Sequence, residues 1–118
     1  MDMEKISWKA GTTIYRLGDE PDYAYLLTEG EIEIYSNMGT KVGFINQDEV
    51  FGEQSILLET KRTITAKASK DSKAFLIPKK TLQRDYLKSS FLIRAILRST
   101  YMRLTNLSST IKKDLESF

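Results

Sequence analysis

Short runs of alternating apolar and polar residues, separated by turn residues, occupy the chain from about residue 10 to residue 77. In residues 31–35, Ile32 and Ile34 lie on one side and the two glutamates on the other, which is the period of a half-buried β-strand. The same reasoning predicts strands at residues 12–15, 23–27, 31–35, 41–45, 63–68 and 73–77. The tripeptide Asn-Met-Gly at residues 37–39 predicts a hairpin turn. This series of short strands predicts a β-roll, sandwich or barrel.

The pattern changes after Pro78 to that of helices. Residues 79–88 predict a short helix, and Ser89 or Ser90 can cap a second one. From residue 91 to about residue 115 there is no Gly or Pro, and one stripe recurs at alternating spacings of four and three residues. The stripe consists of Ile93, Leu97, Thr100, Leu104, Leu107 and Ile111. Such a helix is roughly 35 Å long, longer than a small barrel can cover, so we expect a homodimer through this stripe.

Composition narrows the possible functions. A length of 118 residues suits one domain, and the net charge of +2 gives no reason to expect nucleic-acid binding by electrostatics. The chain has no Cys and no His, which excludes thiolate and imidazole metal sites, Ser-His-Asp catalysis and the histidine-bound metal of cupin enzymes. We therefore expect neither an enzyme nor a metal or other cofactor.

Neither a secretion signal nor a membrane span is expected. The first residues, MDMEKISWKAG, contain acidic side chains and no apolar run, and no stretch approaches the roughly 18 apolar residues of a span. Trp8 is expected in the core. The prediction is a cytoplasmic protein.

The segment FGEQSILLETKRTITA, residues 51–66, gathers residue types that suit a nucleotide. Gly52 allows a positive φ or a close approach of the backbone. Residues 54–58 predict one helical turn, whose first N–H groups suit an anion. Arg62 can donate two charge-assisted hydrogen bonds to a phosphate. The carboxylate of Glu53 can only accept hydrogen bonds, which suits the hydroxyls of a sugar.

This segment resembles the phosphate-binding cassette of the cyclic-nucleotide-binding domains of kinase regulatory subunits, gated channels and the catabolite activator protein. The family's cassette opens with Phe-Gly-Glu, here residues 51–53, and closes with Arg and a small residue, here Arg62 and Thr63. The turn glycines at positions 11, 18 and 30 and the two helices after Pro78 also match. The resemblance covers nearly the whole chain. It implies a mainly β fold, a double-stranded β-helix (jelly-roll or β-roll), followed by a short helix and a long C-terminal helix.

The resemblance implies cyclic AMP or cyclic GMP as the ligand. Glu53 would bind the ribose 2′-hydroxyl, and Ile45 and Ile64 would form walls for the base. The phosphate would be bound by Arg62, Thr63, Ser55 and Gly52. A hydroxyl residue after the arginine occurs in binders of either nucleotide, so Thr63 does not choose between them.

Three positions depart from the family pattern. Asp48 stands where the family has a glycine five residues before Glu53, Ser55 replaces a small apolar residue, and Ile64 replaces a small one. Together with Glu49, Asp48 adds negative charge near the expected phosphate site.

The favoured interpretation is a stand-alone sensor that signals through its C-terminal helix to an unknown effector protein. Helix residues that could approach the base are Arg94, Arg98, Thr100 and Tyr101. The alternative is the same fold with a degenerate pocket, used for dimerisation or protein interaction. In that case Arg62 would form an ion pair with Glu53, or with Glu59 at the surface.

Binding to DNA is not expected of this chain. Regulators similar to the catabolite activator protein carry a helix-turn-helix after the long helix, whereas this sequence ends at Phe118. The output of a sensor would then come from a partner chain or from residues outside this sequence.

Overall fold

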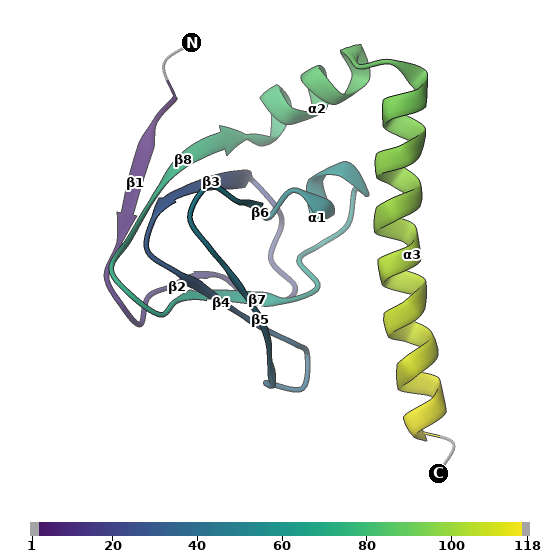
Figure 1. The fold of residues 1–118 in the computed structure, drawn as a ribbon, viewed down its shortest axis with the longest axis horizontal. Coiled ribbons are helices and arrows are strands. Elements are labelled where there is room, and N and C mark those ends of the chain that lie inside the picture. Colours follow the sequence, from purple (N-terminus) through teal and green to yellow (C-terminus); the bar gives the residue numbers. More distant parts are fainter. Residues whose placement is uncertain (1–2, 117–118) are drawn as a thin grey trace.

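The body of the molecule is a β-roll of two four-stranded sheets (Figure 1). The computed structural model describes the backbone of residues 3–116 and the side chains of residues 3–104. One sheet has the order β1 (Lys5–Trp8), β8 (Ser72–Pro78), β3 (Tyr23–Glu29), β6 (Val50–Phe51). The other has the order β2 (Thr13–Tyr15), β7 (Thr65–Ala68), β4 (Ile32–Tyr35), β5 (Lys41–Ile45). All these pairings are antiparallel, and the predicted fold class is confirmed.

The alternation seen in the sequence becomes the two faces of the sheets. Ile32 and Ile34 of β4 are buried, and each lies opposite a buried alanine of β7. Glu33, between them, pairs in register with Lys67 on the outer face. On this sheet the core face is therefore built from isoleucines beside alanines on the neighbouring strand.

Four aromatic rings form the other part of the core. Trp8, Tyr15, Tyr25 and Phe51 are all buried, and their centroids lie 5.0–6.4 Å apart in the contacting pairs. Offset and edge-on pairs at these distances are favourable beyond the area that they bury. The expected burial of Trp8 is confirmed.

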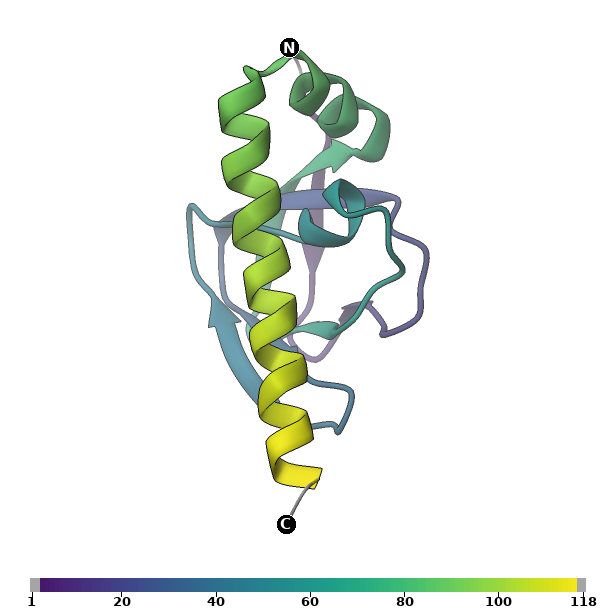
Figure 2. The ribbon, with the colours of Figure 1, turned by 90° about the vertical axis from the view of Figure 1, so that its right-hand side faces the viewer.

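Three helices follow the strands or interrupt them. The single turn α1 (Gln54–Leu57) comes after β6, α2 (Lys79–Lys88) continues from β8, and α3 (Phe91–Glu116) passes beside the end of the roll where α1 lies (Figure 1). Viewed from that side, α3 crosses in front of the roll (Figure 2). This arrangement brings the long helix α3 next to residues 51–66, the segment whose residue types suit a nucleotide.

The corner between α2 and α3 is held by side chains. Ser90 caps α3, because its Oγ accepts a hydrogen bond from the N–H of Ile93 at 3.2 Å. Arg94 Nη1 donates to the Leu87 carbonyl at 3.0 Å, and the Tyr86 hydroxyl donates to the Arg94 carbonyl at 3.3 Å. These contacts join the end of α2 to the start of α3.

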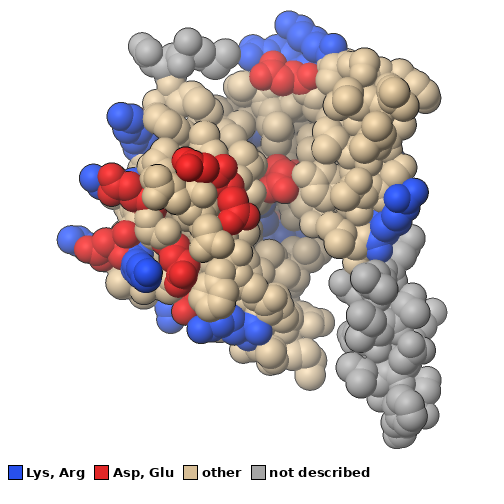
Figure 3. All heavy atoms as spheres, in the orientation of Figure 1, with Lys and Arg blue, Asp and Glu red and all other residues tan. Residues whose placement is uncertain are grey.

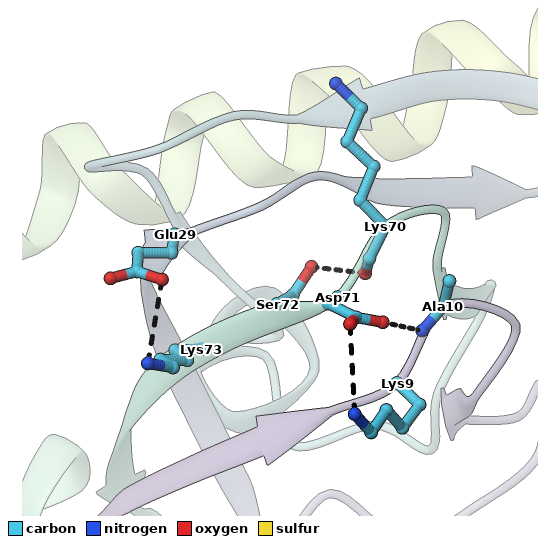
Figure 4. Close-up of polar contacts among 7 residues, drawn as sticks. All are labelled: Lys9, Ala10, Glu29, Lys70, Asp71, Ser72 and Lys73. Carbon is cyan, nitrogen blue, oxygen red and sulfur yellow. Dashed lines mark hydrogen bonds and ion pairs between the residues drawn. The ribbon is translucent and has the colours of Figure 1, made fainter.

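The turn that leads into β8 is tied to its surroundings (Figure 4). Asp71 accepts a hydrogen bond from the Ala10 N–H at 2.9 Å and lies 3.9 Å from Lys9 Nζ. Ser72 is 2% exposed, and its Oγ donates to the Lys70 carbonyl at 2.8 Å. The start of β8 therefore has little freedom to move.

The sequence analysis missed two strands, β1 and β6. The four residues of β1 lie at a sheet edge and three of them are not buried, while β6 has only two residues. Neither segment is long enough to show an alternation of apolar and polar residues that would identify it as a strand. Strand β7 also begins at Thr65, two residues later than predicted, so Thr63 and Ile64 lie in the preceding loop.

Asp48 occupies a backbone conformation that favours glycine. Its φ is +70°, and its N–H donates to the Leu27 carbonyl at 2.7 Å, which holds the conformation in place. Asp48 thus adopts a left-handed conformation at the position where the family pattern has a glycine.

We expect Asp48→Gly to stabilise the domain by about 0.5 kcal/mol, because removing a side chain from the left-handed region outweighs the entropy that glycine adds to the unfolded chain. The urea midpoint should rise at constant slope. The neighbouring Gln47, which has no positive φ, is the control, and Gln47→Gly should destabilise by about 0.5 kcal/mol. Equal losses from both changes would contradict the argument.

Candidate functional site: a cavity in the β-roll at the cassette

A cavity of about 260 Å³ opens where the β5–β6 region and the cassette meet. The space-filling view shows the molecule hollowed between the strands and α3 (Figure 3). All seven candidate residues that the sequence placed in the strands and the cassette line this cavity, namely Gly52, Glu53, Ser55, Arg62, Thr63, Ile45 and Ile64, whereas the four candidates on α3 are not among the lining residues. The remaining lining residues are Tyr15, Ile34, Val50, Phe51 and Gln54. Asp48 and Glu49 are exposed and are not part of the lining.

Arg62 is the charged group at the bottom of the site. It is 4% exposed, and its Nη1 donates to the Gly52 carbonyl at 2.6 Å while Nη2 donates to the Tyr23 carbonyl. Its Nε is buried and has no hydrogen-bond partner among the described residues. A buried donor on a cation is expensive to leave unpaired, so an acceptor that reached this atom would stabilise the site.

The two ion pairs of Arg62 that the alternative interpretation would require are not present among the side chains that the structure describes. Among the described residues it forms no ion pair with Glu53 or with Glu59, and its hydrogen bonds go to main-chain carbonyls instead. Its charge is therefore not neutralised by a carboxylate within ion-pair distance.

Gly52 allows the strand β6 to approach this arginine. Its φ is +79°, and a Cβ there would lie 3.1 Å from Arg62 Nη1 and 3.4 Å from ring atoms of Tyr15 and Tyr25. Both the conformation and the close contacts select glycine. The residue thus places its own carbonyl against the guanidinium.

Glu53 connects the cassette to α3. It directly precedes α1, and its Oε1 accepts a hydrogen bond from the Tyr101 hydroxyl at 3.1 Å. Burial of Tyr101, followed by the charge of Glu53 and their hydrogen bond, raises the pKa of the phenol well above its ordinary value. Tyr101 therefore remains a donor at all physiological pH values.

The other candidate residues on α3 do not reach the site in the same way. Thr100 is exposed and its hydroxyl donates to the Ile96 carbonyl within the helix at 2.9 Å, Arg98 is exposed, and Arg94 is engaged at the α2–α3 corner. Tyr101 is the one of the four with a hydrogen bond to a cavity residue. The sequence named it as a residue that could approach the base, but not as a partner of Glu53.

The cavity has an apolar side formed by isoleucines. Ile34 is buried, whereas Ile45 and Ile64 are half-buried and leave part of their surface toward the cavity. Ser55 is 7% exposed in α1, and Thr63 is exposed at the rim. One cavity thus combines a buried cation, a carboxylate, small hydroxyls and apolar walls.

Other kinds of site were not found in the described part of the chain. No group of three or more His, Cys, Asp or Glu side chains there could hold a metal ion. None of the helices in the same residues combines the length and apolar character needed to cross a membrane.

Comparison with known proteins gives one family and a consistent fold. The family model of the cyclic nucleotide-binding domain matches residues 5–88. A cAMP-dependent protein kinase regulatory subunit from Debaryomyces hansenii is 30% identical over 89 residues, which are 74% of this chain and 20% of that protein. The chain therefore spans about a fifth of the length of this relative.

Two solved structures are similar to this chain in their fold. The cGMP-bound form of the EAL enzyme Bd1971 has a TM-score of 0.82 and 17% identity, covering 96% of this chain and 31% of that one. The sensor domain of the transcriptional regulator DNR from Pseudomonas aeruginosa has a TM-score of 0.72 and 22% identity, covering 90% and 74%. With the cassette residues around one cavity and the family match over most of its length, the chain belongs to the cyclic nucleotide-binding domain family.

Proposed function

We propose that this domain binds cyclic AMP or cyclic GMP in the cavity and that α3 transmits the occupancy to a partner protein. The observation that carries the proposal is the buried Arg62, which lines the cavity with no carboxylate in ion-pair distance and with its Nε unpartnered among the described residues. A cyclic phosphodiester carries one negative charge and several acceptor oxygens. It would neutralise the guanidinium and accept from Nε in a site that excludes most water.

The opposite part of the cavity suits a sugar and a base. Glu53 offers a carboxylate, which accepts hydrogen bonds from hydroxyls such as the ribose 2′-hydroxyl. Ser55 and Thr63 add small polar groups, and Ile45 and Ile64 add apolar surface for a base. The similarity to kinase regulatory subunits supports a regulatory role rather than a catalytic one.

A ligand titration tests the binding step. At 100 times its dissociation constant, a bound nucleotide stabilises a domain by about 2.7 kcal/mol, which is a rise of about 10 °C in melting temperature for a domain of this size. Cyclic AMP and cyclic GMP should be titrated separately, with 5′-AMP as a control that carries a dianionic phosphate. No thermal shift with millimolar concentrations of either cyclic nucleotide would overturn the proposal.

The hydrogen bond between Tyr101 and Glu53 supports the transmission step. It joins the carboxylate expected to bind the ligand to the helix expected to respond, across 48 residues of sequence. A ligand hydroxyl that donates to the Glu53 carboxylate would compete with the Tyr101 hydroxyl for the same acceptor. A ligand that competes with Tyr101 for Glu53 would favour an arrangement of α3 without this hydrogen bond, and such a preference is the condition for a population shift.

We expect Tyr101→Phe to weaken this connection without removing the ring. Stability should fall by about 1 kcal/mol, since a hydrogen bond to a charged but partly exposed group is lost. The ligand-induced change in amide hydrogen exchange of α3 should shrink at the same time. A change in α3 protection equal to that of the wild type would contradict the transmission step.

Tyr35→Phe is the matched control for this variant. Tyr35 also donates its hydroxyl to a glutamate, Glu33, at 2.5 Å, but both lie on β4 outside the cavity. Its removal should leave nucleotide affinity and the response of α3 unchanged.

A second proposal concerns assembly. The first turns of α3 expose large apolar residues, with Leu92 64%, Ile93 49% and Ile96 52% exposed. A row of this kind on one helix suits the same row of a second copy. Of the stripe named from the sequence, Leu97 is half-buried and Leu104 exposed, while the side chains of Leu107 and Ile111 lie outside the described residues.

We expect the domain to dimerise through α3 and Ile93→Glu to make it monomeric, because a desolvated carboxylate without a partner strongly disfavours an apolar interface. Light scattering should give about twice the chain mass of 13.6 kDa for the wild type and the chain mass for the variant. Met38→Glu, at an apolar residue 80% exposed in the β4–β5 turn, is the control and should leave the dimer intact. A monomeric wild type would rule out this assembly.

A further inference from the structure

We propose that Tyr15 is a positioning residue for the phosphate-binding arginine, holding the Arg62 guanidinium in one plane beside the cavity. The inference rests on the proposed binding of a cyclic nucleotide in the cavity. Nothing in the sequence singled out Tyr15. It lies 47 residues before Arg62, at the end of the short strand β2.

The contact itself is a cation stacked on an aromatic ring. The Cζ atom of Arg62 lies 4.0 Å from the centroid of the Tyr15 ring, well within the range of a cation–π interaction. Both side chains are buried, with Tyr15 7% and Arg62 4% exposed. Such an interaction is strongest where water does not compete with it.

The ring of Tyr15 is itself held from behind. It stacks on Tyr25 with a centroid distance of 6.4 Å and an interplanar angle of 17°, and on Phe51 at 6.4 Å and 30°. Since Phe51 belongs to the cassette and Tyr25 to β3, the plane of the ring is defined by two different parts of the roll. The guanidinium thus lies on a rigid surface.

The main chain that follows Tyr15 holds the backbone of the same arginine. The Gly18 N–H donates to the Arg62 carbonyl at 2.8 Å, and the Arg62 N–H donates to the Asp19 carbonyl at 2.8 Å. Residues 15–19 therefore hold Arg62 in place from both its main chain and its side chain.

These contacts hold the Arg62 guanidinium in one orientation. Its face rests on Tyr15, Nη1 and Nη2 donate to the carbonyls of Gly52 and Tyr23, and Nε alone lacks an acceptor among the described residues. The orientation is set before the ligand arrives, so binding does not have to order a flexible arginine. Burial raises the pKa of the Tyr15 phenol to about 12, against the opposing effect of Arg62, so the ring stays neutral and does not compete with a phosphate for the cation.

The test compares Tyr15→Phe with Tyr15→Leu by calorimetric titration of cyclic AMP and cyclic GMP. Phenylalanine keeps the ring face, so its dissociation constant should stay within about twofold of the wild type, whereas leucine should weaken binding roughly 5- to 30-fold. Phe44→Leu is the control. It removes a ring that lies 5.1 Å from another cation, Lys41 Nζ, outside the cavity lining, and it should leave the affinity within about twofold.

A double-mutant cycle separates positioning from general damage to the fold. In an Arg62→Lys background the planar guanidinium is absent, so Tyr15→Leu should change the residual affinity by less than about twofold. Equal losses in both backgrounds, or an equal loss from phenylalanine and leucine, would overturn the inference.

A measurement on the wild-type domain keeps the inference testable if leucine prevents folding. The Arg62 Nε–H proton resonance should be shifted upfield by the Tyr15 ring and should move on Tyr15→Phe far less than on binding of ligand. An unshifted resonance would overturn the stacking. A wild type that binds neither nucleotide but shows the shifted resonance would overturn the proposed function and keep the stacking, so the two failures are distinguishable.

Discussion

Replacing Arg62 with alanine is expected to weaken binding of a cyclic nucleotide at least 100-fold, which would abolish the thermal shift that millimolar ligand gives the wild type. Loss of a charge-assisted hydrogen bond to a phosphate in a buried site, together with loss of the cation that the phosphate neutralises, accounts for about 3 kcal/mol, and each 1.4 kcal/mol is a factor of ten. The removed side chain is the cation at the bottom of the cavity, with Nε as its one donor that has no partner among the described residues.

The stability of the ligand-free domain should change much less than its affinity. Arg62→Ala deprives the carbonyls of Gly52 and Tyr23 of their donors, which costs about 1–3 kcal/mol for a buried acceptor. It also removes a desolvated cation that has no carboxylate in ion-pair distance among the described side chains, which offsets part of that cost. Circular dichroism and urea denaturation without ligand should therefore show a folded variant.

Lys61→Ala is the matched control for this change. Lys61 is adjacent in sequence and carries the same charge, but its side chain is 68% exposed and lies 4.0 Å from Glu20 at the surface. It should keep the affinity within about twofold, because exposed pairs contribute little. A comparable loss of affinity in both variants would mean that general electrostatic attraction, not the cavity, binds the nucleotide.

The largest loss of stability is expected from Gly30→Ala. A Cβ at this position would lie 2.1 Å from Ser72 Oγ and 2.7 Å from the Asp71 carbonyl oxygen, and the φ of Gly30 is +97°. Ser72 cannot withdraw easily, because its Oγ donates to the Lys70 carbonyl and accepts from the Glu31 N–H at 3.2 Å. Steric overlap and backbone strain therefore act together.

We expect Gly30→Ala to lower the free energy of unfolding by at least about 3 kcal/mol, corresponding to a fall of more than about 12 °C in melting temperature. Gly39→Ala is the control, since Gly39 also has a positive φ of +75° but has no atom within 4 Å of the position that a methyl group would take. It should lose only about 1 kcal/mol. Similar losses at both positions would show that backbone conformation alone, without the contact to Ser72, sets the requirement for glycine.

The sequence predicted well those elements whose own residues carry a clear hydrophobic period or a turn signal. The strand at residues 41–45 and the helix at residues 79–88 have the expected bounds, and the hairpin turn forms around Gly39 with a hydrogen bond from its N–H to the Ser36 carbonyl. A clear period or a turn signal marks each of them. The cassette residues were also found, because their types and spacing are compact in the sequence.

Contacts between distant segments could not be predicted in the same way. Arg62 binds two main-chain carbonyls, and any residue type can supply a carbonyl, so no sequence pattern marks that contact. Tyr15 and Tyr101 meet the site from segments 47 and 48 residues away from their partners. In the sequence, a tyrosine is equally compatible with a buried strand position and with the apolar side of a helix. Only the folded structure shows that Tyr15 contacts Arg62 and that Tyr101 contacts Glu53.

The length of α3 has a mechanical consequence. Tyr101 lies 11 residues beyond the corner at Ser90, about 16 Å along the helix axis, whereas Glu116 lies 26 residues beyond it, about 39 Å. With the corner as a fulcrum, a rigid helix magnifies any displacement at Tyr101 about 2.4-fold at its far end. A shift the size of one hydrogen bond's rearrangement at the pocket would thus become a movement large enough to separate or join two surfaces.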